Sequence, residues 1–306
     1  MNILVTGCNG FIGGQVCRLL AESGHRVCGL GHASVNRLEL AEYYSADISS
    51  QDAIEAAAAQ IGSLDAVVHC AAHISYDDAD SRLMAVNAVG TQNIVALAKR
   101  CGASKLIYCS SAPVIGIPIT RPVTEKHPLA PRTMYHVSKL AGEYAVRASG
   151  IKPVILRIPS PIGPGMNRKT FLPVVISSCL ENRPVKLYGT GGRIQNYISV
   201  LDIARAVCLC VKNDAEGCFN LAGDSISNLS LAKLCRELLS SRSEIVFAGE
   251  PDPADDQAWE ISGEKAAAQM GFSPSVGIEE SILALARSYG EPCALKRTAN
   301  LPRRVL

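Results

Sequence analysis

Residues 2–13 read NILVTGCNGFIG, a short apolar run followed by a turn that contains three glycines. The run predicts a strand over Asn2 to Thr6, and a helix is predicted to start at residue 11. The glycines at positions 7, 10 and 13 fall at i, i+3 and i+6. A tight turn without Cβ atoms lets a pyrophosphate approach the helix N-terminus. The stretch therefore predicts a dinucleotide-binding turn, with an ordinary strand-to-helix connection as the alternative.

The alternation of strand and helix continues through the first half of the chain. Further predicted strands cover Arg26 to Leu30, Ala66 to Cys70, Lys105 to Ser110 and Pro153 to Ile158, and predicted helices cover 11–23, 51–61, 81–101 and 135–149. Continuous apolar strands between helices indicate a parallel sheet covered on both faces. We therefore expect an α/β fold, a Rossmann-type doubly wound parallel sheet with a smaller C-terminal α/β substrate-binding region.

The pattern changes after Ile158, where prolines and glycines interrupt regular structure. A helix is predicted over 170–182, and strands over Tyr197 to Val200 and Cys218 to Ala222. Asp202 is predicted to cap a helix that runs through Val211. We expect residues 1–160, joined by 196–222, to form the dinucleotide-binding domain. Residues 161–195 and 223–306 would form the substrate-binding region, with 166–195 and 250–262 shaping its pocket.

Composition excludes several classes of protein. The chain has 306 residues, 48% of them hydrophobic, and a net charge of +2, so it has material for a core and no electrostatic case for nucleic acid or an anionic membrane. No apolar run approaches the roughly 20 residues of a membrane span, and no secretory signal is recognisable, so we expect a cytoplasmic protein. Twelve cysteines without a C-x-x-C pair indicate buried thiols rather than disulfides or a metal site.

The end of the second strand bears on the choice of cofactor. Gly31 and His32 stand where an acidic residue would hold a ribose 2′-hydroxyl. The missing carboxylate leaves room for a 2′-phosphate, which His32 or Arg37 could contact, although both could equally be surface residues. Asp47 and Ile48, after a short third strand, could flank the adenine. The missing acidic residue favours NADP over NAD as the cofactor, and both remain open.

Tyr135 and Lys139 are four residues apart on a predicted helix, so they share one face. An ammonium group beside a phenol lowers the phenol's pKa, and such a tyrosine can exchange a proton with a substrate hydroxyl. A surface pair is the alternative. Ser110 and Ser111 end a strand at the sheet edge where sites form. We expect Ser111 to meet the substrate oxygen, whereas Ser110 fits a turn.

Together these features resemble the extended short-chain dehydrogenase/reductases, the nucleotide-sugar epimerase/dehydratase family. The resemblance covers essentially the whole chain. The matching stretches are Thr6 to Gly13, His69 to Ala72, Asn87 to Asn93, Ser110 to Ala112, Tyr135 to Lys139, Gly163 to Gly165, and Tyr197 to Asp202.

The resemblance implies a role for each matching residue. Tyr135 would be the catalytic acid/base, Lys139 its partner and Ser111 the hydroxyl that orients the substrate. The implied cofactor contacts are Gly7, Gly10, Phe11, Ile12 and Gly13 at the pyrophosphate, Ala71 and Ala72 beside the cofactor, Asn87 supporting the site, and Pro159 and Ser160 at the nicotinamide carboxamide. Tyr135 and Lys139 would also contact the cofactor. The family often dimerises through the helices that correspond to 81–101 and 135–149, which implies a homodimer.

Departures from the family's pattern concern the substrate. Dehydratases carry an Asp-Glu pair after the catalytic hydroxyl residue, whereas Ser111 is followed by Ala112-Pro113, which argues against 4,6-dehydration. Epimerases often have Asn where this chain has Ser160. Arg193 is the candidate for the substrate diphosphate, although the family's arginine can stand at the position of Gln195. His73 lies near the expected substrate side, where a plain polar loop is the alternative.

These expectations define an NAD(P)-dependent enzyme that transfers hydride at a sugar carbinol carbon, C4 of a nucleotide-linked sugar, with Tyr135 as acid/base. An epimerase would return the hydride to the other face of the ketone. An NADPH-dependent reductase of a 4-keto sugar or another ketone is the alternative. A non-catalytic dinucleotide sensor is a third possibility, but such relatives tend to lose the tyrosine and the lysine.

Overall fold

The computed structural model describes residues 1–34, 36, 38, 40 and 42–289. Its centre is a seven-stranded sheet in the order β10-β6-β5-β4-β1-β2-β3, with every pair of neighbours parallel. The strands are β1 (Asn2–Thr6), β2 (Arg26–Gly31), β3 (Glu42–Ser45), β4 (Ala66–His69), β5 (Lys105–Ser111), β6 (Lys152–Ile158) and β10 (Gly217–Asn220). The predicted doubly wound parallel sheet is confirmed. The strand order reverses between β1 and β4, where ligands bind in such sheets.

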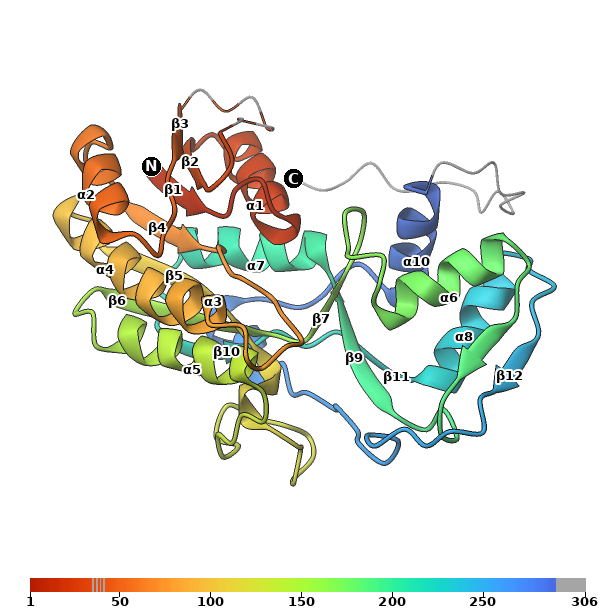
Figure 1. Ribbon diagram of the computed structural model, residues 1–306. Coiled ribbons are helices and arrows are strands. Elements are labelled where there is room, and N and C mark those ends of the chain that lie inside the picture. Colours follow the sequence, from red (N-terminus) through yellow and green to blue (C-terminus); the bar gives the residue numbers. More distant parts are fainter. Residues whose placement is uncertain (35, 37, 39, 41, 290–306) are drawn as a thin grey trace.

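Helices cover both faces of this sheet (Figure 1). One layer contains α1 (Phe11–Glu22), α7 (Val200–Lys212) and α9 (Glu264–Met270), and the other contains α2 (Gln51–Gln60), α4 (Gly90–Arg100) and α5 (Met134–Arg147). Ile3 and Val5 of β1 pack into the first layer, and Leu4 packs into the second. Burial on both faces explains why the strands are continuously apolar.

The helix predicted over 81–101 is interrupted in the structure. It consists of α3 (Arg82–Met84), a π-helical turn η1 (Ala85–Val89) and then α4. A π-turn adds a residue to the helical repeat and is frequent at functional sites. This one contains Asn87, whose contacts are described below.

The rest of the chain forms a smaller region, on the right in Figure 1. It contains a three-stranded sheet, β11-β9-β7, and a two-stranded sheet, β12-β8. These are β7 (Ser160–Ile162), β8 (Val185–Leu187), β9 (Ile194–Ser199), β11 (Asp224–Ser227) and β12 (Ile245–Phe247), packed with α6 (Phe171–Leu180), α8 (Asn228–Leu238) and α10 (Ile278–Arg287). The strand β9 belongs to this small sheet, whereas α7 and β10 return to the large sheet.

The prediction that Asp202 caps a helix is wrong. The N-cap of α7 is Ser199, whose side chain accepts from the backbone N–H of Leu201. Asp202 lies in the first turn and is fully buried. Its carboxylate accepts from the backbone N–H groups of Ser275 and Val276, both at 2.9 Å, and therefore anchors the segment that leads into α10.

Within the described ranges, eleven cysteines are free and nine of these are buried. No group of His, Cys, Asp and Glu in this part of the chain could hold a metal ion. None of the helices there has the length and apolar character needed to cross a membrane.

Candidate active site

The glycine turn after β1 has backbone geometry that side chains would block. Gly7 adopts a φ of +66°, and a Cβ there would lie 2.8 Å from the backbone N of Ala71. A Cβ on Gly13 would lie 2.2 Å from the carbonyl oxygen of Gly7. Both positions therefore require glycine, and the turn is pressed against the segment that follows β4.

The N-terminus of α1 opens from this turn. Its N-cap is Gly10, and no side chain caps the first turn of the helix. Backbone N–H groups at such a terminus, together with the helix dipole, bind phosphate groups. The turn and the helix thus form a backbone cradle that fits the pyrophosphate of a dinucleotide.

The segments expected to meet the adenosine are held by a tyrosine that was not selected from the sequence. A Cβ on Gly31 would lie 2.9 Å from the Tyr43 hydroxyl. That hydroxyl accepts from the Asn9 amide at 3.2 Å and donates to the carbonyl of Ala33, so it ties the glycine turn to the chain after β2. His32 is exposed beside Gly31. Arg37 lies outside the described residues.

Asp47 and Ile48 follow β3 on the same side of the sheet. The Asp47 carboxylate accepts from the Ser49 backbone N–H at 2.9 Å and from its hydroxyl at 2.8 Å, and these bonds lower the pKa of Asp47. Ile48 is buried, and its carbonyl accepts from the Asn93 amide at 2.8 Å. Asp47 is exposed and therefore remains open to a ligand.

A buried histidine joins the carboxyl ends of β1 and β4. His69 is fully buried, with Nδ1 2.6 Å from the Thr6 hydroxyl and Nε2 3.0 Å from the Thr91 hydroxyl. Burial, and then the nearby charge of Lys139, lower its pKa to about 3. The Thr6 hydroxyl also accepts from the backbone N–H of Ala71 at 3.2 Å. This neutral ring therefore positions the chain beside the glycine turn.

Asn87, on the π-turn, links that chain to α5. Its amide makes two 2.8 Å hydrogen bonds with the backbone of His73 and one of 2.9 Å with the Ser138 hydroxyl. The Ser138 hydroxyl in turn donates to the carbonyl of Tyr135 at 2.7 Å. Asn87 therefore ties the backbone at His73 to α5 through Ser138. The His73 ring pairs with Asp80 at 2.7 Å and lines neither of the two cavities described below.

Tyr135 and Lys139 lie one turn apart on α5, which begins after the N-cap Thr133. Lys139 is buried, and its ammonium lies 4.2 Å from the centre of the Tyr108 ring. Burial lowers the pKa of Lys139, and the proximity of Tyr135 opposes that shift. The pKa of Tyr135 is raised by burial, although Lys139 acts to lower it. The direction expected for the tyrosine is therefore reversed, because desolvation outweighs the ammonium.

The two serines that end β5 have different surroundings. Ser110 donates to Glu143 at 2.7 Å, and Arg157 pairs with the same buried carboxylate at 2.9 Å. The Ser111 side chain does not cap the following turn η2 (Ala112–Ile115), although Ser111 is its N-cap residue. Ser110 therefore belongs to a structural network, whereas the Ser111 hydroxyl takes no part in it.

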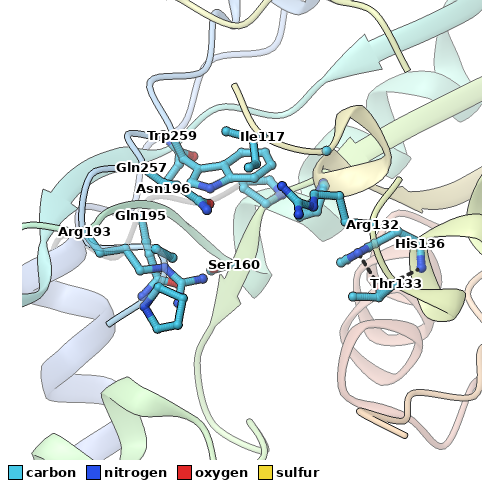
Figure 2. Close-up of a pocket in the computed structure, with 15 residues that line it drawn as sticks. Ile117, Arg132, Thr133, His136, Ser160, Arg193, Gln195, Asn196, Gln257 and Trp259 are labelled. Atoms are coloured by element: carbon cyan, nitrogen blue, oxygen red, sulfur yellow. Dashed lines mark hydrogen bonds between the residues drawn. The ribbon is translucent and has the colours of Figure 1, made fainter. Parts of the chain in front are cut away.

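A cavity of about 470 Å³ opens beside these residues (Figure 2). Among the residues predicted for the site, Pro159, Ser160 and Arg193 line it, whereas Tyr135, Lys139 and Ser111 do not. Residues close to them in the chain line the cavity instead, namely Pro113, two residues after Ser111, and His136, directly after Tyr135. A second cavity of about 410 Å³ shares Arg193, Gln195 and Pro253 with the first.

Arg193 stands where the two cavities meet. Its Nε is buried without a hydrogen-bond partner in the described part of the chain. The turn before it is held by Asp255, whose carboxylate accepts from the backbone N–H groups of Thr190 and Gly192, both at 2.8 Å. Gln195 occupies the other position at which the family can carry its arginine. It lines the same cavities and donates to Asn228 at 3.1 Å. Asp255 lies in the stretch 250–262, which was expected to shape the pocket.

Comparison with known proteins agrees with this geometry. The sequence profile of the NAD dependent epimerase/dehydratase family matches residues 3–222. The chain belongs to this family.

Similar proteins show the breadth of the family. UDP-glucuronic acid decarboxylase 1 of Xenopus tropicalis is 26% identical over 92% of this chain and 70% of its own length. UDP-glucose 4-epimerase of Thermotoga maritima, solved with UDP-glucose, superposes with a TM-score of 0.86 at 24% identity, over 94% of this chain and 98% of its own. UDP-glucose 4-epimerase of Thermus thermophilus, solved with NAD, superposes with a TM-score of 0.82 at 24% identity, over 94% of this chain and 99% of its own. The structural matches establish the shared fold.

Several polar or aromatic residues in the cavity of this family member were not selected from the sequence as binding residues. Arg132 and His136 flank Tyr135 along the chain, and Gln257 and Trp259 come from the distant loop before α9. The only signals were that His136 follows Tyr135 directly, that Arg132 lies three residues before it, and that residues 250–262 were expected to shape the pocket. Only the folded chain shows that these two segments, distant in the sequence, line the same cavity.

Proposed function

We propose that the chain transfers hydride between a nicotinamide dinucleotide and a carbinol carbon, C4, of a nucleotide-linked sugar, with Tyr135 as acid/base. The observation that carries the proposal is a juxtaposition at one edge of the sheet. The backbone cradle of Gly7 and Gly13 lies at the carboxyl end of β1. Lys139, one turn after Tyr135 on α5, lies over Tyr108, which pairs with His69 at the carboxyl end of β4. The cavity lined by Arg193 opens beside them.

The proposed chemistry assigns a separate task to each side chain. Tyr135 takes the proton of the sugar hydroxyl as the oxygen becomes a carbonyl, and returns it when the carbonyl is reduced. Lys139 stabilises the phenolate while the proton is away, since its charge favours that form. Ser111 donates to the same substrate oxygen. The bound nicotinamide would supply the hydride acceptor and donor.

The two cavities support a division of the substrate. Arg193, with an unpartnered buried Nε at their junction, would bind the diphosphate. The larger cavity, beside Ser160 and His136, would hold the sugar ring, and the smaller cavity, beside Phe171 and Tyr188, would hold the nucleoside. We further propose that the large sheet with α7 is the dinucleotide-binding domain and the small sheets are the substrate region.

We propose an epimerase as the principal outcome. The runner-up, a reductase that uses NADPH, is favoured by the missing acid after Gly31. Dehydration is disfavoured, although the family includes dehydratases. Ala112 and Pro113 follow Ser111, and none of the described residues that line the larger cavity is Asp or Glu, so none of these supplies a carboxylate to remove a hydroxyl from the ring.

Identifying the dinucleotide released on denaturing freshly purified protein tests the proposal. Retained NAD, near one per chain, supports an internal redox cycle, and C4 inversion of UDP-, dTDP-, GDP- or CDP-sugars should then be detectable by NMR. Empty protein that binds NADPH better than NADH would favour the reductase. Protein that binds neither dinucleotide would contradict the proposal.

We also propose a homodimer formed through the helices over 81–101 and 135–149. Val89 and Tyr144 on these helices are 46% and 59% exposed, so each offers apolar surface that the helices of a second copy would cover. Light scattering coupled to size-exclusion chromatography should give twice the chain mass. A monomer across the micromolar range would contradict this proposal.

A further inference from the structure

The larger cavity has an uneven charge. Among the described residues, its lining contains two arginines, Arg132 and Arg193, together with His136, and no acidic side chain. The proposed function uses Arg193 for the diphosphate. Figure 2 shows Arg132 and His136 on the opposite side of the cavity from Arg193. One diphosphate group therefore leaves the second guanidinium without a ligand.

The Arg132 side chain is not engaged elsewhere. It is exposed, and none of the recorded ion pairs or hydrogen bonds within the described ranges involves its guanidinium. Figure 2 shows it extending toward Ile117 and Trp259, which form an apolar wall. A planar guanidinium presents two parallel N–H donors that match the oxygens of a carboxylate.

His136 adds a donor on the same side. Its Nδ1 lies 2.7 Å from the Thr133 hydroxyl, which also accepts from the His136 backbone N–H at 3.3 Å. The Thr133 hydroxyl can donate to Nδ1 while it accepts from the backbone, and in that tautomer Nε2 carries the ring hydrogen and serves as a donor in the cavity wall. Burial lowers the pKa of His136 to about 4, so the ring is a neutral donor at neutral pH.

The nearby carboxylates are engaged elsewhere. Asp78 accepts from the backbone N–H of Met134 at 2.8 Å, at the start of α5, and does not line the cavity. Asp80 is paired with Arg82 at 2.8 Å and with His73 at 2.7 Å. Neither carboxylate neutralises Arg132.

We propose that Arg132 and His136 form a specificity subsite for a carboxylate on the sugar ring, so that the substrate is a nucleotide-linked acidic sugar rather than a neutral hexose. The proposal rests on the proposed function, because it takes the diphosphate to lie at Arg193. Arg132 would hold both carboxylate oxygens, and His136 would donate to one of them. The carboxylate remains intact in this subsite, which binds and orients the ring.

Calorimetric titration of the purified protein, supplied with NAD, tests the subsite. The titrants are the glucose and glucuronate derivatives of UDP, dTDP, GDP and CDP. The glucuronate of the preferred nucleotide should bind at least about 10-fold more tightly than the glucose. Arg132→Met should remove this preference. Its affinity for the glucuronate derivative should fall about 10- to 100-fold, as expected for a lost bidentate pair, whereas its affinity for the glucose derivative should change little. His136→Gln should give a smaller loss.

Arg183→Met is the matched control, because Arg183 is exposed, pairs with Glu181 and lies outside both cavities. It should keep the preference for glucuronate. Equal binding of glucose and glucuronate, or a preference that survives Arg132→Met, would overturn the subsite and leave the proposed function standing. If no sugar nucleotide binds, the proposed function fails and the subsite fails with it.

Discussion

Ser110 donates its hydroxyl proton to Glu143 at 2.7 Å, whereas no hydrogen bond of the adjacent Ser111 hydroxyl is recorded among the described residues. Strand alternation turns the two side chains to opposite faces of β5. The Ser110 hydroxyl is thereby committed to the interior against α5, and the Ser111 hydroxyl is left at the carboxyl end of β5.

Substituting the two serines separately should produce opposite results. Ser111→Ala should lower kcat about 10- to 100-fold and leave the melting temperature unchanged, because the substrate oxygen loses one partner. Ser110→Ala should lower the free energy of unfolding by about 1–3 kcal/mol, since a buried carboxylate loses a donor, and keep most of the activity. Steady-state kinetics and urea unfolding check both. Equal effects of the two variants on kcat would contradict the assignment of Ser111.

Glu143 should be a main structural residue of α5. The carboxylate is fully buried, bonded to Ser110 and paired with the buried Arg157. Glu143→Leu leaves a buried guanidinium without its partner, so we expect a loss of about 3–5 kcal/mol in urea unfolding. Asp214→Asn, which breaks an exposed pair with Lys152, should cost less than about 1 kcal/mol. Similar losses for the two variants would be evidence against this network.

The sequence predicted the first half of the fold closely, because each of its signals is local. The signals for the strand from Asn2 to Thr6 and for the turn after it lie in adjacent residues, and both were placed correctly. The role of Asp202 depends on Ser275 and Val276, more than 70 positions away. A cap and a long-range anchor use the same residue type, so the sequence alone could not separate them.

The cavity was harder to predict than the sheet for the same reason. Arg132 and Trp259 meet across it although they are far apart in the chain. Tyr43 holds the glycine turn through Asn9, a contact that no spacing indicates. The pKa of Tyr135 depends on how much of the phenol is buried, which the i, i+4 spacing to Lys139 does not specify.

Gly13→Ala should prevent dinucleotide binding. The added Cβ would lie 2.2 Å from the carbonyl of Gly7, so the turn must shift, although alanine is the better helix former by about 0.5–1 kcal/mol. We expect at least about a 10-fold loss of dinucleotide affinity in fluorescence titration. Gly62→Ala is the control, because nothing lies within 4 Å of its Cβ. A Gly13→Ala protein with unchanged affinity would show that the cradle lies elsewhere.

The stability should fall at acidic pH through His69. Its pKa in the folded protein is about 3, against an ordinary value of 6.5, so only the unfolded chain binds a proton between these values. Its contribution is therefore complete above pH 6.5 and declines as the pH drops toward 3, by at most about 1.4 kcal/mol per pH unit. Urea unfolding between pH 7 and pH 5 checks the slope. An NMR titration in which the His69 ring protonates above pH 5 would refute this.

The most direct measurement is the effect of Tyr135→Phe on hydride transfer and on dinucleotide binding in the same preparation. Hydride transfer would be followed by absorbance of the reduced nicotinamide after mixing with the sugar nucleotide that wild-type protein turns over. We predict that the rate falls by at least about 100-fold while the dinucleotide Kd changes less than about 3-fold, because only the proton transfer is lost. An unchanged rate in Tyr135→Phe protein would contradict the assignment of Tyr135 as the acid/base.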